Sequence, residues 1–168
     1  METRFSPSEL EAISAALADT SEGLTGSEIG HRRATLEMAD PTPGITKWKR
    51  LHNAFVKRQK DSGNRRAILE FIRRAMKPER YAKTPDRFEQ LRANLNRAVA
   101  FSGLAVDVSG QLYCVDRAET ISDAQRRADE LRVDLTTRGV HPDVLRFCRA
   151  ELVADNYFHA VLEATKNA

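Results

Sequence analysis

The chain has 168 residues, of which 41% are hydrophobic and 30% are charged. This length and composition are typical of one globular domain, or of one domain plus a fragment, and they exclude a chain that is disordered throughout. No apolar run is long enough to span a bilayer, and the first ten residues contain no apolar signal core, which predicts a cytoplasmic protein with no membrane partner. Cys114 and Cys148 lack metal-ligand spacing, so we expect reduced, buried thiols.

Charge is distributed unevenly along the sequence. Residues 31–83 contain fifteen Lys or Arg and five Asp or Glu, whereas residues 1–30 and 84–168 each carry a net negative charge. A basic centre between acidic flanks is typical of a protein with an anionic partner, most often a nucleic acid. The alternative is that these charges solvate helix surfaces or pair with the flanks.

Two capping boxes predict the starts of the first two helices. Ser6 with Glu9 marks one start, and Thr25 with Glu28 marks the other. Pro7 strengthens the first start, because proline suits the first turn of a helix. We therefore expect one helix from Pro7 to about residue 19 and another that begins just after Thr25.

Two arginines stand where the second helix needs apolar residues. Arg32 and Arg33 lie between Ile29 and Leu36, which share one helical face. The favoured interpretation is that both arginines extend into solvent from a short, poorly buried helix. The alternative is that they face a ligand.

Basic faces characterise the next two predicted helices, over about 46–60 and 65–76. Trp48, Leu51 and Phe55 share one side of the first of them, with Trp48 as a core anchor rather than a base-stacking residue. If the two helices pack antiparallel, their basic faces merge into one patch that binds phosphates with little sequence preference. The candidate nucleic-acid-binding residues are Lys49, Arg50, Asn53, Lys57, Lys60, Arg66, Arg73 and Lys77.

The remaining elements are predicted from shorter signals. A helical turn at 78–81 precedes a helix from 85 to about 102. Apolar residues then alternate on both sides of Ser109-Gly110, which predicts a β-hairpin over 104–115. A charged helix with a sparse apolar seam follows from about 121 to 139, and we interpret it as a connector.

The last stretch, 141–166, is apolar nearly all round, so other elements are expected to wrap it. In His141-Pro142, Asp155-Asn156-Tyr157 and Ala160-Val161 it resembles the start of the Ymh-type conserved hypothetical proteins, found around prophages, plasmids and restriction loci. That family looks related to the HEPN superfamily, whose active members are helical, metal-independent ribonucleases. The resemblance implies an incomplete HEPN-like bundle, and the preceding unit is similar to the sensing modules of abortive-infection proteins.

No catalytic motif accompanies this resemblance. The HEPN signature is an Arg, a polar residue, three variable residues and a His, and no Arg of the chain has a His at that spacing. Asp155, His159 and Glu163 are spaced four residues apart, but capping and hydrogen bonding explain them better than metal binding. We therefore predict no catalytic residue, no metal ligand and no cofactor, and we expect the chain not to be an enzyme.

These observations predict a mainly α fold with one β-hairpin. Residues 5–115 are expected to form a helical, sensor-like domain, and residues 120–168 a connector helix plus the first helices of a truncated HEPN-like bundle. The favoured function is a non-catalytic accessory or sensor unit of a phage-defence protein that binds RNA or DNA. One alternative is a protein-interaction module that binds a second copy or a missing bundle partner. A weaker alternative is a ribonuclease fragment whose site is completed in trans.

Overall fold

The computed structural model describes residues 4–137, with side chains described as far as residue 131. Within this range the chain is mainly helical, with one two-stranded antiparallel hairpin. The predicted mainly α fold with one β-hairpin is therefore confirmed. The elements are α1 (Pro7–Leu17), α2 (Gly26–Thr35), α3 (Lys47–Ser62), α4 (Arg66–Ala75), the short 3₁₀ helix η1 (Pro78–Tyr81), α5 (Pro85–Val99), the 3₁₀ turn η2 (Ala100–Ser102), β1 (Leu104–Val106), β2 (Leu112–Cys114) and α6 (Ile121–Thr137).

Local capping bonds begin α1 and α2, as predicted. The Ser6 Oγ accepts a bond from the Glu9 N–H at 3.3 Å, and the Glu9 carboxylate accepts one from the Ser6 N–H at 2.7 Å. Thr25 and Glu28 make the same reciprocal pair at 3.2 and 2.8 Å. Because each box needs only residues three positions apart, the sequence alone predicts both starts.

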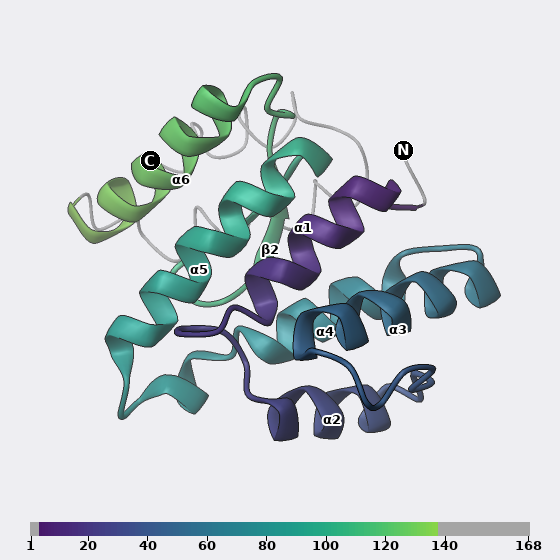
Figure 1. Ribbon diagram of the computed structural model, residues 1–168. Helices are drawn as coiled ribbons and strands as arrows, with labels where there is room; N and C mark the ends of the chain where they lie inside the picture. The colour runs from purple at the N-terminus through teal and green to yellow at the C-terminus, as the bar shows by residue number, and fades with distance from the viewer. Residues whose placement is uncertain (1–3, 138–168) are drawn as a thin grey trace, which may run out of the picture.

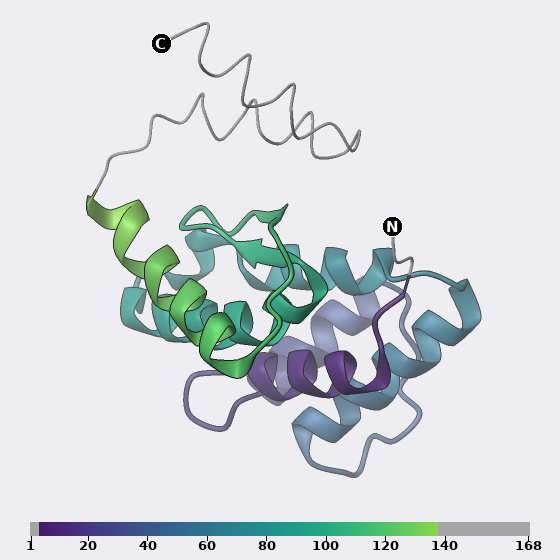
Figure 2. The same cartoon turned by 90° about the horizontal axis from the view of Figure 1, so that it is seen from above.

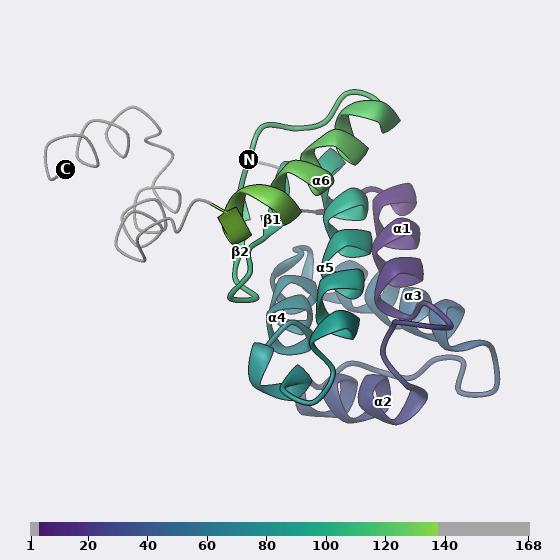
Figure 3. The same ribbon diagram turned by 90° about the vertical axis from the view of Figure 1, so that its left-hand side faces the viewer.

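The other elements pack around α5. Figures 1 and 3 show α5 between α1 on one side and α6 on the other, with α2 at the end of the molecule away from α6. Viewed from above, the hairpin lies beside α6 (Figure 2), and β1 packs on α5. One apolar core joins these elements, because each contributes a stripe of large side chains that is withdrawn from water. Its fully buried members include Ile13, Leu17, Ile29, Leu51, Phe55, Phe71, Leu91, Leu95 and Val106.

The helix predicted as a connector packs against α5 and η2. Ala124 and Ala128, two members of its sparse apolar seam, are buried. Small side chains at these positions let the α6 backbone approach its neighbours closely. The predicted division of the chain into 5–115 and 120–168 stays a prediction, because residues 138–168 lie outside the described range.

The hairpin is shorter than predicted, and its turn presses against the end of α4. Ala105 pairs with Tyr113 in an antiparallel register, and all three β1 residues are buried. Gly110 in the turn has φ +74°, and a Cβ built there lies 1.8 Å from the Met76 carbonyl oxygen. Glycine is needed at this position both for the left-handed backbone and because the hairpin turn approaches the backbone of Met76 closely.

Gln59 fastens the N-terminal segment to α3. Its side-chain amide donates to the Phe5 carbonyl at 2.8 Å and accepts from the Phe5 N–H at 2.9 Å, and all three groups are buried. Replacing Gln59 by leucine leaves both Phe5 backbone groups unpaired, so we expect the free energy of unfolding to fall by about 2 kcal/mol. Urea denaturation measures this loss, with Gln90→Leu at an exposed site of α5 as the control. Equal losses for the two variants would contradict a structural role for Gln59.

Other sequence predictions concern thiols, metals and membranes. Cys114 is a free thiol that is half-buried against the core, so it does not reach the predicted full burial. Cys148, Asp155, His159 and Glu163 lie outside the described residues. No helix of the described range is long and apolar enough to cross a membrane. Within the same range, no three His, Cys, Asp or Glu side chains gather where they could hold a metal ion.

Candidate nucleic-acid interface

The structure separates the eight predicted nucleic-acid-binding residues into two groups. Figure 1 shows α4 running back beside α3 after the turn that joins them. Lys57, Lys60 and Arg66 lie near this turn. The others lie farther along the two helices or just beyond α4, and they are Lys49, Arg50, Asn53, Arg73 and Lys77.

Two of these residues hold the loop that precedes α3. Arg50 Nε donates to the Asp40 carboxylate at 3.0 Å, and Asn53 donates to the Thr42 hydroxyl at 3.0 Å. Arg33 binds the same Asp40 carboxylate at 2.8 Å. The hydrogen bond from Arg50, together with the charge of Arg33, lowers the pKa of Asp40. The side chains of Arg50 and Asn53 therefore already make hydrogen bonds within the protein.

Exposed ion pairs involve two of the predicted residues, one near the end of α4 and one just beyond it. Arg73 lies 3.9 Å from Glu70, and Lys77 lies 3.8 Å from Glu79. These side chains are about 40–70% exposed, so solvent screens both pairs and each is weak. A phosphate can replace the carboxylate in either pair at little cost, so Arg73 and Lys77 stay available to an anion.

Lys49 and Trp48 lie next to one another near the start of α3. Lys49 is exposed, and its ammonium lies 5.6 Å from the centre of the Trp48 ring. Trp48 is half-buried and packs against the main core, as expected of a core anchor. Lys49 therefore keeps an accessible charge beside an aromatic ring.

Six cations surround the turn between α3 and α4, and they are termed the turn cluster. Asp61 is the one acidic residue between positions 57 and 66, and it pairs with Lys57 at 3.0 Å. Among the described residues no other ion pair involves the cluster. Counting Asp61, the turn carries an excess of five positive charges. The turn cluster consists of Arg4, Lys57, Arg58, Lys60, Arg65 and Arg66.

Tertiary contacts bring in members of the turn cluster that the sequence reasoning missed. Arg4 donates to the carbonyl of Gly63, 59 residues away, at 2.9 Å. The Arg65 guanidinium lies 4.9 Å from the centre of the Phe5 ring, a contact that orients it. No sequence signal places Arg4 here. The five cations within residues 57–66 are a signal that could have identified Arg58 and Arg65.

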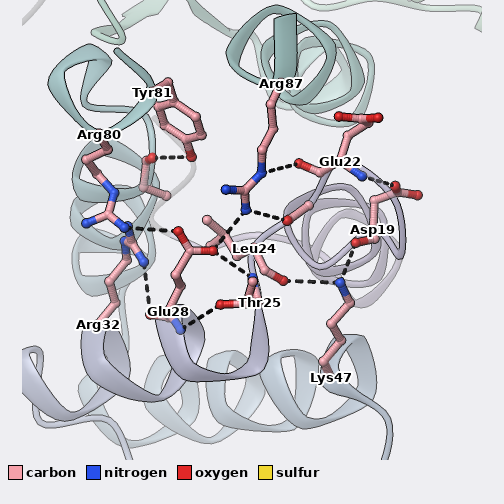
Figure 4. A network of polar contacts seen from close by, with 12 residues as sticks. Asp19, Glu22, Leu24, Thr25, Glu28, Arg32, Lys47, Arg80, Tyr81 and Arg87 are labelled. Carbon is pink, nitrogen blue, oxygen red and sulfur yellow. Dashed lines mark hydrogen bonds and ion pairs between the residues drawn. The ribbon is translucent and has the colours of Figure 1, made fainter. Parts of the chain in front are cut away.

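A second cationic network lies where α2 meets η1 and α5 (Figure 4). Glu28 accepts a bond from Arg80 at 3.1 Å on one carboxylate oxygen and from Arg87 at 2.9 Å on the other. Burial opposes ionisation of this carboxyl, but the Thr25 N–H and the Arg87 guanidinium outweigh it and lower the pKa of Glu28 to about 2. Glu28 is therefore ionised at neutral pH and links three elements.

Arg32 lies buried beside this network, with 3% of its surface exposed. Its Nη1 donates to the Glu28 main-chain carbonyl at 2.9 Å, whereas its Nε and Nη2 have no hydrogen-bond partner among the described residues. The prediction that Arg32 extends into solvent is wrong, because Arg32 shares with Ile29 the face of α2 that packs on the core. The Arg33 side chain also has a partner within the protein, because its Nη1 donates to the Met38 carbonyl at 2.7 Å.

A groove of about 220 Å³ lies between α6, α5 and the hairpin. Its lining is mostly apolar, and none of its lining residues belongs to the turn cluster or to the Glu28 network. The groove is thus a third feature, separate from the two cationic ones. The lining residues are Asn96, Ala100, Leu104, Ala105, Val115, Arg127, Ala128, Glu130 and Leu131.

Comparison with known proteins bears on the end of the chain. Residues 138–168 match the family model described as a protein of unknown function, Hypoth_ymh. This segment contains the residues that carry the Ymh-type resemblance, so the match supports a Ymh-type relationship. No curated protein and no solved structure matches the chain.

Proposed function

We propose that residues 4–137 bind RNA or DNA through the turn cluster, as a non-catalytic accessory or sensor unit of a phage-defence protein. The observation that carries this proposal is the excess of five positive charges around one turn, with a single ion pair to Asp61. Unpaired surface cations bind phosphates because condensed counterions are released from the nucleic acid. The phage-defence context is part of the proposal and rests on the resemblance to Ymh-type proteins found around prophages, plasmids and restriction loci. The family model that matches residues 138–168 is itself described as a protein of unknown function.

The contact is expected to involve the phosphate backbone more than the bases. Lys60 and Arg66 are exposed and have no ion pair within the described range, so a phosphate reaches them without breaking an existing contact. Arg73 and Lys77 extend the surface along α4 once a phosphate replaces their weakly held carboxylates. Contacts of this kind give little sequence preference and a steep dependence on salt.

A double variant, Lys60→Gln with Arg66→Gln, tests the proposal. Both sites are exposed, so the fold is expected to persist, while two phosphate contacts are lost. We expect the affinity for labelled RNA or DNA to fall roughly tenfold and the salt slope to decrease by about 2. Fluorescence anisotropy at two salt concentrations measures both quantities.

The control is the double variant Lys83→Gln with Arg126→Gln, which removes the same charge at exposed sites outside the turn cluster. Its affinity is expected to change less than twofold. An equal loss in both double variants would show that net charge alone drives binding. Absence of binding at low salt would refute the proposal altogether.

A protein-interaction module is the second candidate, favoured by the groove under α6 and by Ile121, whose surface is 82% exposed. Sedimentation velocity over a range of concentrations tests this candidate. Self-association without affinity for nucleic acid would favour it over the turn-cluster proposal. A ribonuclease fragment with a site completed in trans stays a prediction.

A further inference from the structure

Three guanidinium groups surround a single carboxylate where α2 meets η1 and α5. Figure 4 shows Arg32 and Arg80 on one side of Glu28 and Arg87 on another. The Glu28 carboxylate is bound by Arg80 and Arg87, and Arg32 reaches only the main-chain carbonyl of Glu28. Within this group of four side chains, positive charge exceeds negative charge by two. Arg32 is therefore a buried cation without a carboxylate of its own.

Burying the Arg32 guanidinium without a carboxylate partner is energetically unfavourable. An arginine stays protonated under all ordinary conditions, so it cannot relieve the cost of burial by losing its proton. Burial, followed by the nearby charge of Arg80, lowers the pKa of Arg32, which shows that its surroundings disfavour the cation. Its Nε and Nη2 also lack acceptors within the described residues. A buried charge and two buried donors without acceptors are normally matched by an anion.

We propose that this network binds a small oxyanion of the phosphate class between Arg32 and Arg80. An oxyanion supplies what the described side chains do not, namely negative charge and several acceptor oxygens for the Arg32 Nε and Nη2. Guanidinium groups suit this ligand because their forked N–H groups match the geometry of a phosphate. The ligand would neutralise part of the local excess of positive charge.

Arg80 and Arg87 differ in how firmly they are held. Arg87 donates to the carbonyls of Glu22 and Gly23 at 3.4 and 2.8 Å in addition to its bond with Glu28. Arg80 makes one ion pair, at 3.1 Å, its side chain is 33% exposed, and it stands on the short η1 helix. Arg80 is therefore the side chain that turns to admit the anion to Arg32, while Arg87 keeps Glu28 in place.

This site is distinct from the turn cluster. No residue of the turn cluster lies beyond Arg66, the first residue of α4, whereas Arg80 lies beyond the last residue of that helix. The inference therefore does not depend on the proposed nucleic-acid contact, and either can fail without the other. The Lys60→Gln/Arg66→Gln variant is expected to keep its response to phosphate.

Thermal unfolding of the full chain in inorganic phosphate tests the inference. Chloride is used to hold the ionic strength constant. Ligand binding to the folded state raises Tm by mass action, so we expect a rise of roughly 5–10 °C at about 100 times the Kd. Arg80→Gln is expected to lose most of this rise, and Arg32→Met all of it. Arg126→Gln, at an exposed site of α6, is the matched control and is expected to keep the full rise.

Two arms distinguish the sources of the phosphate group. A 5′-phosphorylated dinucleotide is compared with the same dinucleotide lacking the phosphate, and both are compared with inorganic phosphate. A rise in Tm that is larger with the phosphorylated dinucleotide than with inorganic phosphate identifies a phosphomonoester as the ligand. A rise equal to that with inorganic phosphate identifies the free anion. If phosphate leaves the wild-type Tm unchanged, or if Arg80→Gln responds as the wild type does, the inference is overturned. Arg80→Gln decides the matter even if Arg32→Met does not fold, because Arg80 is a surface residue.

Discussion

Replacing Phe71 by alanine is expected to lower the free energy of unfolding by about 3–5 kcal/mol. Phe71 on α4 is fully buried, and its ring meets that of Phe55 on α3 edge to face, with the ring centres 5.1 Å apart. The substitution removes the apolar area of one ring and the aromatic contact of both. It also leaves a cavity between the two helices, which the surrounding core fills only in part.

Urea denaturation followed by circular dichroism measures this loss. Val56→Ala is the control, because Val56 lies beside Phe55 on α3 but is 39% exposed, and its truncation is expected to cost less than about 1 kcal/mol. Since α3 and α4 carry four of the six residues of the turn cluster, the Phe71 variant should also bind nucleic acid more weakly as it unfolds. A loss below about 1.5 kcal/mol would contradict the packing of these two helices.

Replacing Glu28 by glutamine is expected to destabilise the protein by about 3 kcal/mol at neutral pH. The pKa of Glu28 is lowered from 4.5 to about 2 in the folded state, so the ionised form stabilises the fold. The change removes the charge that Arg80 and Arg87 share. It also weakens the cap of α2, because the neutral amide is a poorer acceptor for the Thr25 N–H.

The pH dependence of this effect has a definite sign. A lowered folded pKa means that the stabilisation is fully present above pH 4.5 and is lost as pH falls toward 2. The stability difference between wild type and Glu28→Gln should therefore shrink across this window and vanish near its lower end. Urea denaturation at several pH values from 2 to 7 measures the difference. Comparing the two proteins also cancels the contributions of other carboxyl groups, such as Asp19 and Asp40.

Glu79→Gln provides the matched control for this series. Glu79 is 70% exposed, and its only described ion pair is with Lys77 at 3.8 Å. Solvent screens that pair, so the variant is expected to differ from wild type by less than about 0.5 kcal/mol at every pH. A difference between wild type and Glu28→Gln that stays constant with pH would show that packing, and not charge, accounts for the loss.

Three arginines illustrate why charge positions are harder to predict than helix positions. Arg32 and Arg33 are adjacent in sequence, yet Arg33 binds Asp40 whereas Arg32 has no carboxylate partner of its own. Arg50, predicted to face a nucleic acid, meets the same Asp40. Asp40 lies ten residues before Arg50, and the loop between them has no helical or strand period from which its path could be predicted.

Local signals along the sequence were enough to predict the starts of α1 and α2 and the presence of the β-hairpin. The reciprocal bonds of Ser6 with Glu9 and of Thr25 with Glu28 depend on residues three positions apart, and the hairpin depends on alternation around one turn. The partners of the cations, by contrast, depend on the packing of the helices against one another. This packing brings Arg4 to Gly63 across 59 residues and buries Arg32 beside Glu28. Local hydrogen bonds and side-chain periods are short-ranged and can be read along the chain, whereas the environment of a charge depends on every element that packs around it.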